Sequence, residues 1–199
     1  MKKILITVMT LLCFMHSSWG FFFNGAYEYT TDRGYTVGKT AATIGEIGDW
    51  IQILIPLSAL VYSTAIGDWE GNKQLLYAVG ASTATTEILK FTIAEERPNA
   101  PENSRGRSFP SGHTSFAFSG AGYWQRRYGW YIGAPMYAAA SFVGYSRVAV
   151  KKHNWLDVGV GAALGIGFNY LFTSRYTGNI RISAEPTDSG AYVGFHTQF

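Results

Sequence analysis

Three short segments of this chain combine residue types that suit phosphoryl transfer. They are Lys90 to Pro98, Pro110 to His113, and Ser146 to Asp157. A phosphate with several anionic oxygens is held by fixed cations and backbone N–H groups. Histidine can act on such a group as a nucleophile or as an acid and base. The segments therefore indicate a site for chemistry on a phosphate ester, and they supply the side chains Lys90, Arg97, Arg147, His113, His153 and Asp157.

The three cations are spaced so that they can surround one anion. Lys90 and Arg97 are seven residues apart, about two helical turns, so they share a face where a helix runs out into a loop. Arg147 is the third cation, and its planar fork suits bidentate contact with phosphate. We expect all three to neutralise phosphate oxygens.

The segment Pro110-Ser111-Gly112-His113 is typical of a helix start. Ser111 can cap the helix, and Gly112 lets the backbone approach a ligand closely. The free N–H groups of a helix N-terminus bind anions. His113 at this position would donate a proton to the leaving oxygen.

His153 and Asp157 are four residues apart, so a helix would bring the carboxylate to the imidazole. The carboxylate would fix the tautomer and leave the other ring nitrogen as a nucleophile or a base. Each of these patterns is common alone, as a surface hydrogen bond or a solvated helix face. Their occurrence in order, at helix ends beside apolar stretches, favours one catalytic site.

At these residues the chain resembles the phosphatidic acid phosphatase type 2 superfamily, which includes bacterial acid phosphatases and vanadium haloperoxidases. The family pattern is Lys, six residues, Arg-Pro; then Pro-Ser-Gly-His; then Ser-Arg, five residues, His, three residues, Asp. The resemblance covers roughly residues 75–172. It implies that His153 forms a phosphohistidine, Asp157 orients it and His113 is the general acid. It also implies a phosphate cradle without metal or other cofactor, made by Lys90, Arg97, Ser111, Gly112 and Arg147.

The chain departs from the family pattern just before the second histidine. Many members carry a small or apolar residue there, where this chain has Lys151 and Lys152. We expect the two lysines to lie in a solvated loop, with an extended anionic pocket as the alternative.

The N-terminus has the pattern of a signal peptide, for which we expect residues 1–20. A basic start is followed by an apolar run from Ile4 to Met15 and by the small residues Ser18 and Gly20. A first transmembrane helix is the alternative, but the run of about a dozen residues is short for one. The single cysteine, Cys13, falls in this segment, so the mature chain would have neither a disulfide nor a thiol mechanism. We expect export to the periplasm.

The length of 199 residues predicts one globular domain. We expect an N-terminal extended arm at 21–46, a helical phosphatase domain at 47–173 and a C-terminal β-hairpin tail at 174–199. The predicted fold is mainly α, a helical bundle of about five core helices with a short C-terminal β-hairpin. The helices are expected near 47–67, 73–94, 112–125, 129–147 and 154–173. Their many small residues permit close helix–helix approach.

Hydropathy gives mixed signals about a membrane. The apolar run from Ile51 to Ile66 is flanked by Trp50 and Trp69, as at membrane interfaces. The mean hydropathy is only +0.03, however, and a helix at 112–125 would be about 20 Å long, too short to span. We expect a periplasmic domain held at a membrane surface, with integral insertion as the alternative. The low net charge of +3 without charge blocks excludes a nucleic-acid footprint.

We expect a phosphatase that hydrolyses a phosphomonoester or diphosphate of a membrane lipid, with vanadate as an inhibitor. Aromatic and apolar surroundings of the motifs favour a lipid, although core packing is the more usual role of any one such ring. The alternative is a periplasmic acid phosphatase acting on soluble phosphomonoesters. A vanadate-dependent haloperoxidase is more remote, because those proteins are typically much longer. The aromatic residues concerned are Phe91, Phe109, Phe116, Phe118 and Trp155.

Overall fold

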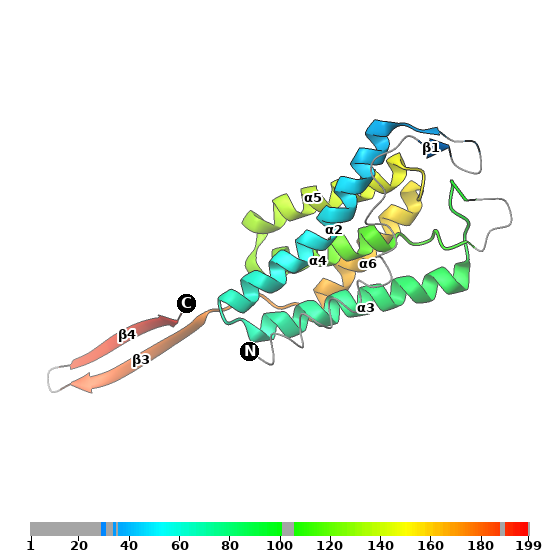
Figure 1. Ribbon diagram of the computed structural model, residues 1–199. Helices are drawn as coiled ribbons and strands as arrows, with labels where there is room; N and C mark the ends of the chain where they lie inside the picture. Colours follow the sequence, from blue (N-terminus) through cyan, green and yellow to red (C-terminus); the bar gives the residue numbers. More distant parts are fainter. Residues whose placement is uncertain (1–28, 31–33, 35, 101–105, 188–189, 199) are drawn as a thin grey trace.

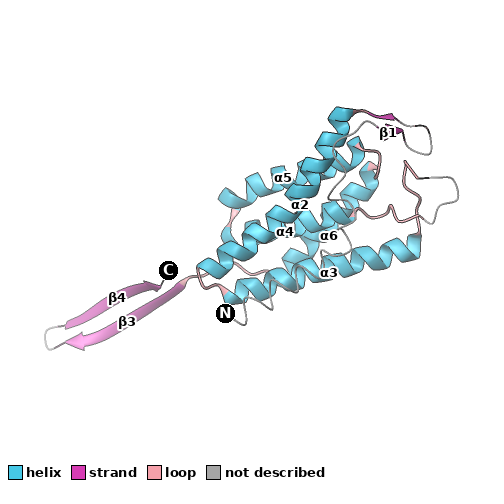
Figure 2. Ribbon diagram, viewed as in Figure 1, coloured by secondary structure: helices cyan, strands magenta, loops and turns pink. Residues whose placement is uncertain are grey.

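The computed structural model describes residues 29–30, 34, 36–100, 106–187 and 190–198 (Figure 1). Within these ranges the chain forms five helices and four short strands (Figure 2). The prediction of a mainly α fold with five core helices is confirmed. The helices are α2 (Lys39–Ala65), α3 (Trp69–Ile93), α4 (Gly112–Tyr128), α5 (Trp130–Ala149) and α6 (Trp155–Phe172). The predicted signal peptide at 1–20 lies outside the described residues.

The strands form two separate antiparallel pairs. β1 (Tyr29–Thr30) pairs with β2 (Thr36–Val37) just before the first described helix. β3 (Asn179–Thr187) pairs with β4 (Gly190–Gln198), with Asn179 opposite Gln198. The residues that would join β3 to β4 lie outside the described ranges, so the C-terminal β-hairpin stays a prediction, as do the domain boundaries.

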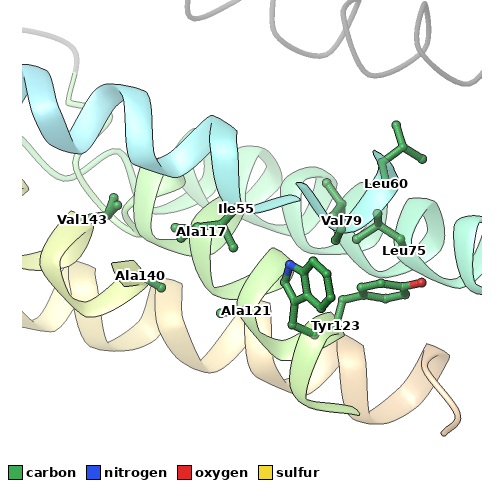
Figure 3. Packing of buried hydrophobic residues seen from close by; sticks show 11 residues of the cluster. Ile55, Leu60, Leu75, Val79, Ala117, Ala121, Tyr123, Ala140 and Val143 are labelled. Atoms are coloured by element: carbon green, nitrogen blue, oxygen red, sulfur yellow. The ribbon is translucent and has the colours of Figure 1, made fainter. Parts of the chain in front are cut away.

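Helix α4 lies at the centre of the bundle and contacts each of the other four helices (Figure 1). Small residues along it allow this close approach. A Cβ atom added at Gly120 would lie 2.7 Å from the backbone nitrogen of Pro56 in α2. The hydrophobic core gathers around the same helix and contains Ile55, Ala59, Leu60, Leu75, Val79, Ala117, Ala121, Tyr123, Trp124, Ala140 and Val143 (Figure 3).

Two helices begin earlier than the sequence predicts. α2 starts at Lys39 rather than near 47, and α3 starts at Trp69 rather than near 73. Gly71 and Asn72 are residue types that favour turns, but here they are buried in the first turn of α3. The carboxylate of Asp68 accepts a hydrogen bond from the backbone of Gly71 and caps the helix, which outweighs the turn tendency of those residues.

Candidate active site

The residues predicted to do chemistry meet at one end of the bundle. That end gathers the last turns of α3 and α5, the first turns of α4 and α6, and the segments between them. Backbone hydrogen bonds tie these parts together, because Ser111 N–H donates to the carbonyl of Asp157 and Ser108 N–H donates to that of Glu95. All the predicted site residues lie there: Lys90, Arg97, Ser111, Gly112, His113, Arg147, His153 and Asp157.

His153 and Asp157 form the pair that their spacing predicts. Nδ1 of His153 lies 3.3 Å from Oδ2 of Asp157, whose side chain is fully buried. Asn154 and Asp157 form a reciprocal capping box at the start of α6, which fixes the carboxylate. With Nδ1 turned toward Asp157, Nε2 is the ring nitrogen that does not face this carboxylate. Burial lowers the pKa of His153 to about 4, so the ring is neutral and nucleophilic near pH 7.

Ser108 completes this pair, and the sequence analysis missed it. Its hydroxyl donates to Oδ2 of Asp157 at 2.6 Å and lies 3.5 Å from Nδ1 of His153. A serine in an irregular loop has no fixed spacing to a helix on the other side of the site. Only its position just before the Pro110-Ser111-Gly112-His113 segment could have drawn attention to it.

Lys90 lies in the last turn of α3 and binds the loop that leads into α4. Its ammonium group donates to three carbonyls, those of Arg107 at 2.9 Å, Ser108 at 3.2 Å and Pro110 at 2.6 Å. Burial, with the nearby charge of Arg97, lowers its pKa to about 8. Lys90 thus contributes charge to the site while its hydrogens bind the protein.

Arg97 differs from Lys90 in its bonding. Within the described part of the chain, no hydrogen bond of its guanidinium group is present, and the side chain is half-buried. Burial and the charge of Arg107 lower its pKa, whereas the charge of Asp157 opposes this. Arg97 therefore offers a donor fork beside the His153–Asp157 pair.

Arg147 and His113 meet a carboxylate that the sequence analysis did not single out. Arg147 is fully buried and donates to Ser146, to the carbonyl of Gly45 and to Asp49. Nε2 of His113 lies 3.0 Å from the same Asp49 oxygen. The sequence feature that could have identified Asp49 is its position directly after the Gly45-x-x-Gly48 spacing in an apolar helix.

Burial is the main cause of the low pKa of His113, about 4, and the hydrogen bond with Asp49 acts in the opposite direction. The imidazole keeps 31% of its side-chain exposure, so it can reach a ligand. It lies in the first turn of α4, where Ser111 caps the helix. This arrangement places an imidazole beside the first backbone N–H groups of α4.

The two lysines before His153 differ in their surroundings. Lys151 is exposed, and its backbone has a positive φ of 58°. Lys152 is half-buried and lies within electrostatic range of Arg147, Asp49 and Arg97. Burial lowers the pKa of Lys152 to about 8. The expectation of a solvated loop thus describes Lys151, whereas Lys152 lies beside the cations of the site.

The described ranges contain no group of three or more His, Cys, Asp or Glu residues that could hold a metal ion.

Comparisons with known proteins place this site in a family. A family model described as the PAP2 superfamily matches residues 73–181. A lipid A 4'-phosphatase of Helicobacter pylori is 32% identical over 70% of this chain and 74% of its own length. A lipid A 1-phosphatase of Porphyromonas gingivalis is 34% identical, over 40% of this chain and 23% of its own length.

A solved structure supports the same relationship. The crystal structure of Aquifex aeolicus LpxE superposes with a TM-score of 0.57 and 28% sequence identity. The match covers 66% of this chain and 84% of that one. Because the family model covers more than half of the sequence and the motifs meet in one site, this chain belongs to the PAP2 superfamily.

Proposed function

We propose that this protein is a phosphatase that removes a phosphate from a membrane lipid through a phosphohistidine on His153. As a member of the superfamily it is a phosphoric ester hydrolase. The observation that carries the proposed mechanism is the buried His153–Asp157 pair, which leaves Nε2 of a neutral imidazole beside a cluster of cations. The relatives named as lipid A phosphatases support a phosphorylated lipid as the substrate class.

In the first step, Nε2 of His153 attacks phosphorus and the bond to the lipid oxygen breaks. Asp157 stabilises the positive charge that develops on the ring, as a carboxylate does in other catalytic histidine pairs. The negative charge of the bound phosphate favours the protonated form of His113, which donates a proton to the departing oxygen, so the lipid leaves as an alcohol. In the second step, His113 takes a proton from water, and the resulting hydroxide displaces phosphate from His153.

The phosphate oxygens are held by Arg97 and by the first N–H groups of α4, where Gly112 permits close approach. These groups are proposed as direct ligands because the guanidinium of Arg97 has no hydrogen bond within the described ranges, and helix N-termini bind anions. Lys90 and Arg147, whose hydrogens bind protein groups, stabilise the negative phosphate by their charge without contacting it. Vanadate, which mimics phosphate in such a cradle, is expected to inhibit.

The surface supports an association with a membrane. α2 and α6 are long and apolar enough to cross one, by length and composition. Large apolar side chains are exposed beside the site, with Phe91 at 70% and Trp155 at 63%. Others lie along α2, α3 and α6, among them Trp50, Leu54, Val61, Ile88, Leu156 and Leu171. We propose that the site faces the periplasm at a bacterial membrane, after removal of the signal peptide.

The proposal is tested by phosphate release from purified protein in detergent, with EDTA present. The substrates would be lipid A, phosphatidic acid and a prenyl diphosphate, beside the soluble ester p-nitrophenyl phosphate. His153→Ala serves as the inactive variant, and His196→Ala removes a histidine from the C-terminal strand as a matched control. Preferential turnover of a lipid supports the proposal. Faster turnover of the soluble ester would instead favour a broad-specificity acid phosphatase, and no release from any ester would overturn both.

A further inference from the structure

Asp49 brings a carboxylate into the site from a helix outside the matched family region. It lies on α2, whereas the family model begins at residue 73. Its Oδ1 receives a hydrogen bond from Arg147 and lies 3.0 Å from Nε2 of His113. One carboxylate oxygen therefore joins a proposed cradle cation to the proposed general acid.

The packing of α2 against α5 fixes the position of Asp49. A Cβ atom added at Gly48 would lie 2.1 Å from Oγ of Ser146, so only glycine permits this approach. The carbonyl of Gly45, one turn before Asp49, accepts a hydrogen bond from the same guanidinium group of Arg147. Arg147 thus binds both ends of one turn of α2, the Gly45 carbonyl and the Asp49 carboxylate, and keeps this carboxylate close to α4.

The charges around His113 otherwise oppose its protonation. Arg147 on α5 and His153 before α6 both disfavour the imidazolium, and burial acts in the same direction. Lys152 lies near Asp49 and adds another positive charge. Among these neighbours, Asp49 on α2 is the group that favours the protonated ring.

We propose that Asp49 is a positioning residue that holds Nε2–H of His113 and thereby reserves Nδ1 for both proton transfers. This inference rests on the proposed function. In the described part of the chain Asp49 is the hydrogen-bonding partner of this ring, through Nε2. The imidazolium gives its Nδ1 proton to the leaving oxygen and becomes the neutral Nε2–H tautomer, still bound to Asp49. The same Nδ1 then accepts a proton from water, which restores the imidazolium.

The first test is the variant Asp49→Asn. The matched control is Glu46→Gln, which also removes one negative charge from α2. Asp49→Asn should lower kcat for a lipid phosphate by about 10- to 100-fold, within the range of general acid catalysis. The loss should be much smaller with p-nitrophenyl phosphate, whose good leaving group needs little protonation. Glu46→Gln should match the wild type on both substrates, and Asp49→Glu should recover part of the loss.

Two further readouts separate this role from a merely structural one. The descending high-pH limb of kcat should move to lower pH by about one unit in Asp49→Asn, because an opposite charge that favours the protonated ring is lost. The double variant Asp49→Asn/His113→Ala should be no slower than His113→Ala alone, because both changes remove the same function. Equal losses on both substrates, an unmoved pH limb or additive losses would overturn the inference.

A measurement without turnover keeps this inference separate from the proposed function. In ¹⁵N-histidine NMR, the His113 signal is the one missing in His113→Gln. We expect the neutral ring to be the Nε2–H tautomer, and its pKa to fall in Asp49→Asn but not in Glu46→Gln. An unchanged titration and tautomer in a folded Asp49→Asn protein would overturn the role of Asp49. An inactive wild type with the expected NMR shift would overturn the proposed function alone.

Discussion

Both ends of the helical bundle contain an Arg–Asp pair, but the two pairs are bonded differently. At the end opposite the site, Arg127 donates to Asp68 through Nε at 2.8 Å and also through Nη2. At the catalytic end, Arg147 donates to Asp49. The first pair ties the end of α4 to the start of α3, and the second ties α5 to α2.

The Arg127–Asp68 pair is buried, and its other hydrogen-bonding partners are neutral groups. Its two side chains retain only 7% and 3% exposure. Asp68 also accepts from Tyr128 and from the backbone of Gly71, while Arg127 donates to the carbonyls of Ser174 and Arg175. Burial raises the pKa of Asp68, but the bonds from Arg127 and the others bring it below its ordinary value. The carboxylate therefore stays charged, and among the described residues no histidine is bonded to it.

The Arg147–Asp49 pair is only partly enclosed, because its carboxylate remains accessible. Arg147 is fully buried, but Asp49 keeps 19% exposure and shares its oxygen with His113. The same two residue types thus form a fully enclosed ion pair at one end and, at the other, an ion pair whose carboxylate also contacts an imidazole. The two pairs differ in the imidazole of His113, which contacts the Asp49 carboxylate and has no counterpart at Asp68 among the described residues.

The largest effect is expected from His153→Ala at the catalytic end. Removing the nucleophile should lower kcat by about 10³-fold or more, as loss of a catalytic nucleophile does in other hydrolases. The midpoint of thermal unfolding should fall less than in the Arg127→Leu variant, because Ser108 and the backbone of Asn154 still bind Asp157. Phosphate release and a thermal melt on the same preparation would check both, and a His153→Ala protein with wild-type turnover would contradict the phosphohistidine mechanism.

Arg127→Leu at the opposite end should instead affect stability. Breaking a buried ion pair leaves Asp68 charged and unpaired, which costs about 3–5 kcal/mol of unfolding free energy. The kcat of the protein that remains folded should stay near the wild-type value. Denaturant unfolding, with activity normalised to folded protein, measures both. A large loss of kcat with unchanged stability would mean that the two ends are coupled in catalysis.

Arg97→Gln should weaken anion binding without destabilising the fold. A hydrogen bond to a charged group contributes about 1.5–3 kcal/mol, so the inhibition constants of phosphate and vanadate should rise by about 10- to 100-fold. Unfolding should be unaffected, because the described residues give this guanidinium group no hydrogen bond. Inhibition assays and a melt would check this, with Arg126→Gln at the far end as the matched control.

The smallest effect is expected from pH. The pKa values of Lys90 and Lys152 are both lowered to about 8, so both side chains are charged below that pH and neutral above it. A phosphomonoester is already mostly a dianion at pH 7, so the affinity for its phosphate group should fall several-fold as the pH rises from 7 to about 9. Lys152→Gln should flatten part of this decline. A phosphate affinity independent of pH over this range would show that neither lysine acts on the anion.

The sequence predicted the parts of the site that depend on local spacing. His153 stands just before the cap of α6 and Asp157 lies in its first turn, so a spacing of four positions brings the two side chains together at the helix start. Ser111 was recognised as a cap because its type and position are typical of a helix start. The five helices were predicted from composition and turn signals, but the starts of α2 and α3 were not. At Asp68 a cap extended α3 through residues that favour turns.

The tertiary structure alone decided which residues meet across helices. Ser108 bonds Asp157, and Asp49 bonds His113, although nothing in their sequence spacing pairs them. The role of Lys90 in binding phosphate stays a prediction, but only the tertiary structure shows that its ammonium group donates to three loop carbonyls. The physical reason is that a contact within a helix follows from its 3.6-residue period. A contact between helices depends on their distance and rotation, which here are set by close approaches such as that at Gly48.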